Sequence, residues 1–282
     1  MVLFDLHTHS NVSDGTFSPV ELVREAYNKG LSAIALTDHD TIGGFIKAVP
    51  EAERLGVKLI SGVEISASEY NELHILGLGI DINNNGLNSE LEKCAASRKD
   101  HIYNICNLLK EKNIILDAGK IIESAGYSVG KPHIANDMIQ KGYVKTQNEA
   151  FDKYLETPQI KNLKKYKIGY KKAVELIHGA GGFVVLAHPH KIELNDIKLD
   201  DFVDSFTGLD GIEAFYSEHT SEQTEYLLKL AERNNLLISC GSDFHGKNKP
   251  DIELGTGLNN SLLKQRELFP VGDKKMIITK FL

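Results

Sequence analysis

Two histidines and an aspartate near the N-terminus have the residue types and the spacing of a metal site. His7 and His9 are two residues apart, directly after the apolar run 2–4. Because side chains alternate between the two faces of a strand, an extended conformation here places both imidazoles on one face. Asp14 follows in a Ser-Asp-Gly turn, which can bring its carboxylate back over the pair. The stretch is therefore predicted to hold a metal ion.

A single His-x-His pair is a weak signal, but similar side chains recur after other apolar segments. Asp243 and His245 again lie two residues apart after such a segment, and His39, Glu64 and His188 each follow one of their own. In a parallel barrel, the carboxyl ends of the strands are where active sites are built. We therefore expect these side chains to converge on one site.

As a set, these motifs resemble those of the polymerase and histidinol phosphatase (PHP) family of metallo-phosphoesterases, over residues 2 to about 246. The matching motifs are His7-Thr8-His9 with Asp14, Leu36-Thr37-Asp38-His39-Asp40, Gly62-Val63-Glu64, Leu73-His74-Ile75-Leu76-Gly77, Ala187-His188-Pro189 and Gly241-Ser242-Asp243-Phe244-His245. The His-Ile-Leu-Gly motif and Lys131-Pro132-His133 are most similar to the stand-alone branch that includes 3',5'-nucleoside bisphosphate phosphatases and 5'-to-3' exoribonucleases.

Strand and helix patterns alternate along much of the chain, which predicts a parallel sheet. After the first strand, strands are expected at 32–37, 57–63, 73–79, 182–188, 211–215 and 236–240, and helices at 18–30, 42–55, 170–180 and 219–233. Residues 87–170 have no strand pattern and are expected to form helices at 87–112, 117–125, 131–141 and 147–155.

The resemblance implies an α/β fold, a distorted (β/α)7 TIM-like barrel of the PHP type. Residues 1–86 and 171–282 would form the barrel, and residues 87–170 a helical insert over its C-terminal mouth, acting as a lid or substrate subdomain. Because the insert lies between the strands that carry His74 and His188, we expect both of its connections to leave from the mouth.

Length and composition agree with one barrel and a small insert. The chain has 282 residues, of which 41% are hydrophobic, and a TIM-like barrel needs about 200 to 250 residues. No apolar run approaches the roughly 20 residues that cross a bilayer, and no signal peptide is evident, so a cytoplasmic protein without membrane contact is expected. The widely spaced Cys94, Cys106 and Cys240 are expected to be reduced thiols.

The net charge of −7 argues against a broad basic surface for nucleic acid, since such affinity comes from Lys and Arg neutralising phosphates. We therefore expect no stable binding of duplex DNA. A small phosphorylated substrate or a short single-stranded nucleic acid stays compatible with this charge.

The histidines and carboxylates of the motifs are too numerous for one metal ion. Ten candidate ligands are present: His7, His9, Asp14, His39, Glu64, His74, His133, His188, Asp243 and His245. One ion usually takes about four to six protein and water ligands, so two or three divalent ions are expected. Imidazole and carboxylate donors without thiolate favour Mn, Fe or Zn over Ca, and the resemblance implies Mn. The surplus positive charge of such a centre suits a phosphate monoester dianion.

The expected reaction is hydrolysis of a phosphate monoester by a metal-bridging hydroxide. Metal ions about 3.5 to 4 Å apart can share a hydroxide and stabilise both oxygens of an in-line displacement. Glu64 is the expected bridging carboxylate, and Asp243 and His188 complete the predicted catalytic set. The sequence assigns no acid for the leaving oxygen. Asp38 and Asp40 are expected either to orient a ligand histidine or to cap the following helix.

Substrate contacts are expected in the insert. Lys131, His133 and Lys167 are the candidates, and His133 is equally well a metal ligand or a capping histidine at the start of a helix. The run from Lys164 to Lys167 combines basic and aromatic side chains, which could hold the phosphate and base of a nucleotide. A 3',5'-bisphosphate nucleotide or the end of a short RNA is therefore the expected substrate.

Three alternatives are open. The first is a histidinol-phosphate-type or other small-molecule phosphatase. The second is an amidohydrolase-like hydrolase of C–N or C–O bonds, which shares the barrel and the His-x-His start but usually has a bridging carboxylated lysine where this chain has Glu64. The third is a non-catalytic PHP module that stabilises a polymerase, although this sequence has no polymerase region and retains every ligand position.

Overall fold

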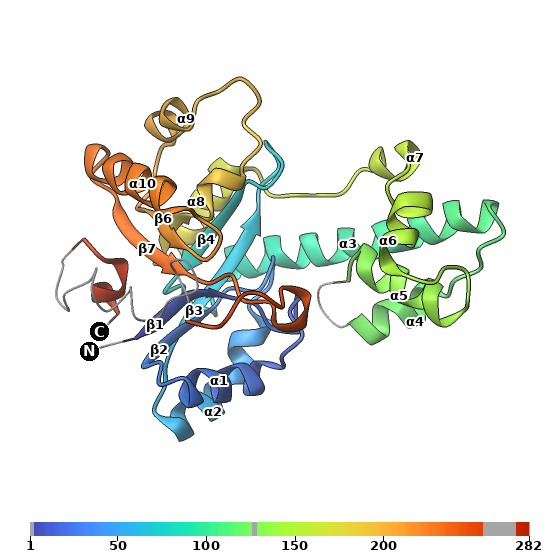
Figure 1. Ribbon diagram of the computed structural model, residues 1–282, viewed down its shortest axis with the longest axis horizontal. Helices are drawn as coiled ribbons and strands as arrows, with labels where there is room; N and C mark the ends of the chain where they lie inside the picture. Colours follow the sequence, from blue (N-terminus) through green and yellow to red (C-terminus); the bar gives the residue numbers. More distant parts are fainter. Residues whose placement is uncertain (1–2, 126–128, 256–274, 282) are drawn as a thin grey trace. The chain divides into compact units, whose positions relative to one another are not determined.

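The computed structural model describes residues 3–125, 129–255 and 275–281. The chain forms two compact units (Figure 1). The first, Met1–Ser89 with Ile168–Leu282, is called the barrel unit, and the second, Glu90–Lys167, is called the helical unit. The helix α3, Asn85–Glu111, crosses the boundary between the two units.

Seven strands form the sheet of the barrel unit, in the same order as they occur in the sequence. They are β1 Phe4–Thr8, β2 Ala33–Leu36, β3 Lys58–Ser66, β4 His74–Leu78, β5 Phe183–Leu186, β6 Gly211–Tyr216 and β7 Leu237–Gly241. The end of β7 returns to β1, because the His9 amide donates to the Phe244 carbonyl and the Asp243 amide donates to the His7 carbonyl. The sheet is thus a nearly closed barrel, and the predicted TIM-like fold is confirmed.

The prediction of an entirely parallel sheet is wrong at β4. This strand pairs antiparallel with both of its neighbours, so that His74 lies opposite Ser66 and Ile75 lies opposite Leu186. Parallel strands need a crossover of about a dozen residues or more, and the connection of residues 67–73 is too short for one. The reversal brings the start of β4, at His74, to the barrel edge where the parallel strands end.

The direction of β4 also changes where the chain leaves the barrel. Because β4 ends at Leu78 on the opposite edge, the connection to α3 (Asn85–Glu111) starts there, and the prediction that both connections leave from the mouth is wrong for this one. The returning chain does reach the mouth, since the Ser68 amide, just beyond the end of β3, donates to the Ile168 carbonyl at 3.1 Å.

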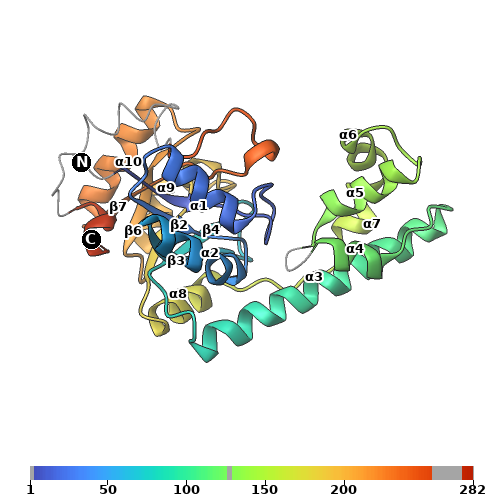
Figure 2. The same ribbon diagram turned by 90° about the horizontal axis from the view of Figure 1, so that it is seen from below.

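The helices of the barrel unit are α1 Pro19–Asn28, α2 Gly43–Leu55, α8 Tyr170–Gly179, α9 Leu199–Ser205 and α10 Ser221–Arg233. All but α9 were predicted. Ser18 and Glu21 form a capping box at the start of α1, which satisfies amides that have no partner inside the helix. The helices α1 and α2 lie side by side (Figure 1, Figure 2), and Leu22 and Ala48 from their apolar faces pack in one cluster with Ile34 of β2.

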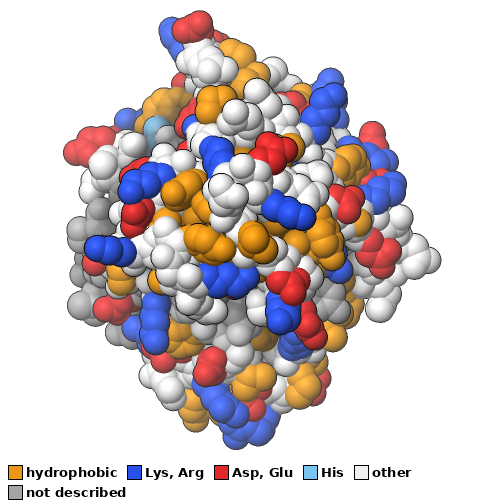
Figure 3. Space-filling model, turned by 90° about the vertical axis from the view of Figure 1, so that its right-hand side faces the viewer, with side chains coloured by type: hydrophobic (Ala, Val, Ile, Leu, Met, Phe, Trp, Pro, Cys, Tyr) orange, Lys and Arg blue, Asp and Glu red, His pale blue; other side chains and the backbone are white. Residues whose placement is uncertain are grey.

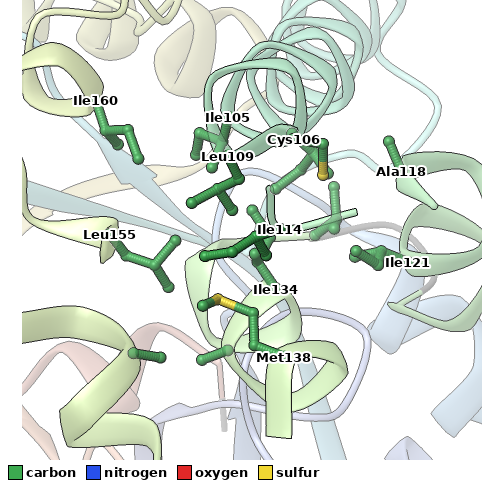
Figure 4. Close-up of a cluster of buried hydrophobic side chains, with 14 of the residues drawn as sticks. Ile105, Cys106, Leu109, Ile114, Ala118, Ile121, Ile134, Met138, Leu155 and Ile160 are labelled. Atoms are coloured by element: carbon green, nitrogen blue, oxygen red, sulfur yellow. The ribbon is translucent and has the colours of Figure 1, made fainter. Parts of the chain in front are cut away.

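The helical unit has a hydrophobic core of its own. Besides the greater part of α3, it contains α4 Ala118–Ala125, α5 Lys131–Gln140, α6 Gln147–Ala150, a π-helical turn Phe151–Leu155 and α7 Pro158–Lys161. Ile105 and Leu109 of α3 meet Ile134 and Met138 of α5 in this core (Figure 4). α3 has 27 residues but carries charges along its length, and none of the helices in the described residues has the length and apolarity to cross a bilayer.

Truncation of this core is expected to destabilise the helical unit. Ile105 is fully buried, so Ile105→Ala should lower the free energy of unfolding of the unit by about 2–5 kcal/mol, through lost burial and an unfilled cavity. Amide hydrogen exchange in α3 and α5 measures this locally. The matched control is Ile115→Ala, at a side chain that is 64% exposed, which should change stability by no more than about 0.5 kcal/mol. Equal effects of the two variants would contradict this description of the core.

Candidate metal centre

Nine of the ten predicted metal ligands lie together at one edge of the barrel unit. The parallel strands supply them at or beyond their carboxyl ends, and the antiparallel strand β4 supplies one at its start. The nine are His7, His9 and Asp14 from β1 and the turn after it, His39 after β2, Glu64 of β3, His74 of β4, His188 after β5, and Asp243 and His245 after β7. The tenth, His133, belongs to the helical unit.

Glu64 is the centre of this arrangement, and its two oxygens face different imidazoles. Oε1 lies 3.0 Å from His74 Nδ1 and 3.1 Å from His188 Nε2. Oε2 lies 3.0 Å from His9 Nε2, 3.1 Å from His39 Nδ1 and 3.3 Å from His7 Nε2. A carboxylate with nitrogen donors on both oxygens has the geometry needed to join two metal positions.

The other two carboxylates extend the cluster on the side of His9 and His245. Asp243 Oδ1 lies 3.3 Å from a ring nitrogen of each of these histidines, and Asp14 Oδ1 lies 3.2 Å from His245 Nε2. Three overlapping sets have ligand atoms within 4.8 Å of one another: His9, Asp14, His39 and His245; His7, His9 and Asp243; and His39, Glu64 and His74. The side chains thus offer donors for more than one ion.

Several buried donor atoms of the cluster are not satisfied by the protein. Within the described residues, Asp14 Oδ1, Glu64 Oε2 and His39 Nδ1 are buried and close to other atoms of the cluster, but none of these contacts has the geometry of a hydrogen bond. In addition, His74 Nδ1 lies only 3.2 Å from His188 Nε2, and two imidazole lone pairs at this distance repel each other unless a proton or a cation lies between them. Imidazole and carboxylate donors of this kind fit divalent transition metals.

The ionisation of Glu64 also suits metal binding. Burial raises the pKa of the Glu64 carboxyl, but the nearby imidazoles of His39 and His7 outweigh it and hold the pKa well below its usual range. Glu64 is therefore a carboxylate near pH 7, which is the form that coordinates metals.

Two of the candidate ligands have strained backbones. His188 has a φ of 28° and Asp243 a φ of 57°, in the left-handed region that side chains other than glycine rarely adopt. Such conformations persist only where the surroundings hold them. The His188 amide donates to Glu213 Oε2 at 2.8 Å, and the Asp243 amide donates to the His7 carbonyl at 2.8 Å. These contacts turn both side chains away from the regular strand direction.

Glu213 is a neighbour of the cluster that the sequence patterns did not identify. It is fully buried in β6, and its Oε1 lies 3.0 Å from His7 Nδ1. Gly241 on the neighbouring strand leaves room for this pair, because a Cβ there would lie 2.2 Å from the His7 Cβ and 2.6 Å from Glu213 Oε1. The available signal was a single carboxylate inside the otherwise apolar segment Gly211–Tyr216.

The helix-capping role expected for Asp38 and Asp40 is wrong. Neither caps α2, whose N-cap is Ile42 without a side-chain hydrogen bond. Asp38 instead accepts hydrogen bonds from the Ser10 amide at 2.7 Å and from the Ser13 hydroxyl at 2.7 Å. It therefore holds the loop that leads to Asp14. Asp40 accepts a hydrogen bond from the Ser66 amide at 3.1 Å, at the end of β3.

In the helical unit, the predicted substrate contacts lie at the start of α5 and near residue 165. His133 Nδ1 accepts a hydrogen bond from the Gly130 amide at 3.2 Å, as a capping side chain does. Lys131 pairs with Glu156 at 2.7 Å. It also lines a pocket of about 290 Å³ with Arg98, His101, Val129, Gly130, Pro132, Phe151 and Lys165.

Several basic side chains lie close together at this pocket and lower the pKa of two of its lining residues. Burial lowers the pKa of Lys165, and the nearby charges of Arg98 and Lys167 lower it further, to about 8. Burial and the charge of Lys165 also lower the pKa of His101. Positive groups that depress one another's protonation mark a place where an anion would bind favourably.

Comparison with known proteins agrees with the arrangement of the barrel unit. The PHP domain matches residues 5–235. A 5'-3' exoribonuclease from Haemophilus influenzae is 35% identical over 247 residues, which cover 86% of this chain and 89% of the relative. A 3',5'-nucleoside bisphosphate phosphatase from Chromobacterium violaceum is 30% identical over 260 residues, which cover 90% of this chain and 91% of the relative.

A solved structure from Bifidobacterium adolescentis, for which a metal-dependent phosphoesterase function has been suggested, shares the fold. The two chains superpose with a TM-score of 0.75 and 29% identity, over 93% of this chain and 94% of the other. Together with the match over residues 5–235, this similarity shows that the chain belongs to the PHP domain family and is a metal-dependent phosphoesterase.

Proposed function

We propose that this enzyme hydrolyses phosphate monoesters of nucleotides, such as 3',5'-bisphosphates or the ends of short RNA, at a centre of two or three manganese ions. The observation that carries the proposal is the environment of Glu64, whose two oxygens each face at least two imidazoles within 3.3 Å. A shared carboxylate surrounded by nitrogen donors is the expected geometry of a multinuclear metal centre.

The ions would be held by the nine clustered donors, with Glu64 shared between positions. When bound, divalent ions supply Lewis acidity and make hydroxide available near neutral pH. Imidazole and carboxylate donors suit manganese, iron and zinc, and we propose manganese. Two or three divalent ions carry more positive charge than Asp14, Glu64 and Asp243 neutralise. This surplus of positive charge favours a dianionic phosphate monoester as the substrate. A neutral amide, the substrate class of the alternative C–N hydrolase, would gain less from it.

The protein also sets the orientation of the donors. Glu213 accepts from Nδ1 of His7 at 3.0 Å, so a neutral His7 would keep its proton on that nitrogen and leave Nε2, on the side of Glu64 and His9, free for a metal. Glu213 therefore selects the tautomer of His7 that binds a metal. Asp243 and His188 complete the proposed catalytic set, and their left-handed backbones aim the side chains at the same centre.

The nucleotide part of the proposal rests on the helical unit, taken as a substrate subdomain within residues 87–170. Its pocket combines the charges of Arg98, Lys131 and Lys165 with the ring of Phe151, a suitable lining for a phosphate beside a base or sugar. Lys131, His133 and Lys167 are proposed to contact the substrate. On the face shown in Figure 3, Lys and Arg alternate with Asp and Glu, which suits a small or short single-stranded ligand better than duplex DNA.

We further propose that the enzyme acts in the cytoplasm. Cys94, Cys106 and Cys240 are free thiols and buried, as expected for a protein of a reducing compartment.

The purified protein should bind at least two manganese ions per chain, because the three donor sets contain more ligands than one ion can use. Elemental analysis after dialysis against Mn²⁺ gives the stoichiometry. Removal of the ions with a chelator should lower the melting temperature, since a ligand that binds only the folded chain stabilises it. One ion or fewer at saturating Mn²⁺ would contradict the proposed centre.

Glu64→Ala and Asp243→Ala should each abolish turnover while the chain still folds, because either change removes metal donors and leaves the apolar core intact. Steady-state rates and the melting temperature of the metal-free proteins measure the two effects. Glu175→Ala serves as the control, at a carboxylate whose side chain is 68% exposed on α8. Retention of more than about a tenth of the rate, or roughly 1.4 kcal/mol in the barrier, would exclude that residue from the catalytic set.

The substrate preference should follow charge. At low salt we expect a higher kcat/KM for adenosine 3',5'-bisphosphate than for AMP, histidinol phosphate or p-nitrophenyl phosphate. The advantage should shrink at high salt, where exposed charges are screened over about 8 Å. Lys131→Ala combined with Lys167→Ala should reduce it. The control is Lys153→Ala, at a lysine of the helical unit that is 61% exposed. If the double variant ranks the four substrates by kcat/KM as the wild type does, the enzyme is better described as a general small-molecule phosphatase.

A further inference from the structure

Lys249 places a positive charge beside the candidate metal centre. Its ammonium group contacts Oδ2 of Asp243, whereas Oδ1 of the same carboxylate lies 3.3 Å from His9 Nε2. The two oxygens of the Asp243 carboxylate therefore have different partners, one the imidazoles of the cluster and the other a lysine. None of the PHP motifs includes this lysine, which follows the last of them by four residues.

The two acids near Lys249 also have other polar partners. Glu218, which also lies close to this group, already forms an ion pair with Lys191 and accepts a hydrogen bond from Tyr216 at 2.5 Å. Asp243 has Tyr216 Oη at 2.9 Å from Oδ2 and the imidazoles of the cluster on its other oxygen. Both carboxylates thus have polar partners besides Lys249.

The position of Lys249 is set by hydrogen bonds to the loop that carries Asp14. It follows the 3-10 turn Gly246–Asn248. The Lys247 amide donates to Thr16 Oγ1 at 2.9 Å, and the Asn248 side chain donates to the Asp14 carbonyl at 2.7 Å. The Lys249 side chain stays 28% exposed, so a ligand that enters from solvent can reach it.

With divalent ions on the donors, a lysine at this place would be repelled by them, and carboxylates that ligate the ions would attract it less. An anion bound at the centre removes this conflict. We propose that the Lys249 ammonium binds a non-bridging oxygen of the substrate phosphoryl group, next to the ions held by Asp243. This inference rests on the proposed function and adds a substrate-binding residue to it.

The competing explanation is that Lys249 only holds Asp243 in place. A variant of Tyr216 distinguishes the two explanations, because its hydroxyl lies near the same Asp243 oxygen but carries no charge. A role in holding Asp243 would give Tyr216→Phe and Lys249→Met similar defects, including a loss of bound metal. A role in phosphoryl binding would weaken the affinity for a dianion in Lys249→Met alone, with the metal content retained.

The test uses the full-length, manganese-loaded protein and two non-hydrolysable probes of similar shape. Phenylphosphonate is a dianion above neutral pH, and benzenesulfonate is a monoanion. Calorimetric titration should show that Lys249→Met weakens phenylphosphonate binding by about tenfold or more, as expected for loss of a charge-assisted hydrogen bond, and weakens benzenesulfonate binding less. Lys249→Arg should restore part of the affinity. The control Lys247→Met, at the exposed lysine two residues earlier, should bind as the wild type does.

A phenylphosphonate affinity in Lys249→Met within twofold of the wild type would overturn the proposal. So would a loss of manganese from Lys249→Met that Tyr216→Phe reproduces. If the wild type still hydrolyses phosphate esters, either result rejects only the role of Lys249 and leaves the proposed function unchanged. A wild type that hydrolyses no phosphate ester would instead remove the proposed function itself.

Discussion

The barrel unit depends on one electrostatic constraint, which is the burial of Glu64 among imidazoles. Five histidine nitrogens lie within 3.3 Å of its two oxygens. Desolvation of a carboxylate is costly, and imidazole lone pairs that face one another add repulsion. The arrangement is favourable only if positive charge is shared among these atoms, as protons or as metal ions. A site of this kind is therefore built to bind cations, and the rest of the barrel has to supply donors at the correct places.

The backbone meets this requirement through the directions of its strands. Parallel strands deliver their last residues to one edge, and the reversed β4 delivers its first residue, His74, to that same edge. Close packing then requires glycine where these side chains lie against the backbone of a neighbouring segment. Gly241 leaves space for His7 and Glu213, and at Gly44 a Cβ would lie 1.9 Å from Asp38 Oδ2. Glycine at these two positions preserves the geometry of the centre, because any side chain there would displace a donor or the group that holds it.

Much of this arrangement could be predicted from the sequence, because the information is local. Short motifs at the ends of apolar segments identified nine side chains that the fold brings together, although their role as ligands stays a prediction. Glu213 and Tyr216 were missed because their contacts with His7 and Asp243 are made between segments far apart in the chain. Lys249 lies only six residues after Asp243, but no distinctive spacing marks it. The direction of β4 was missed because an apolar strand has the same pattern in either direction. Only the length of the loop of residues 67–73 distinguishes the two.

The two units share a property that bears on what they bind. In the barrel unit, the Lys249 ammonium lies beside Asp243, and in the helical unit burial lowers the pKa of Lys165, with the charges of Arg98 and Lys167 lowering it further. An anion that binds at either place would be attracted by these positive groups.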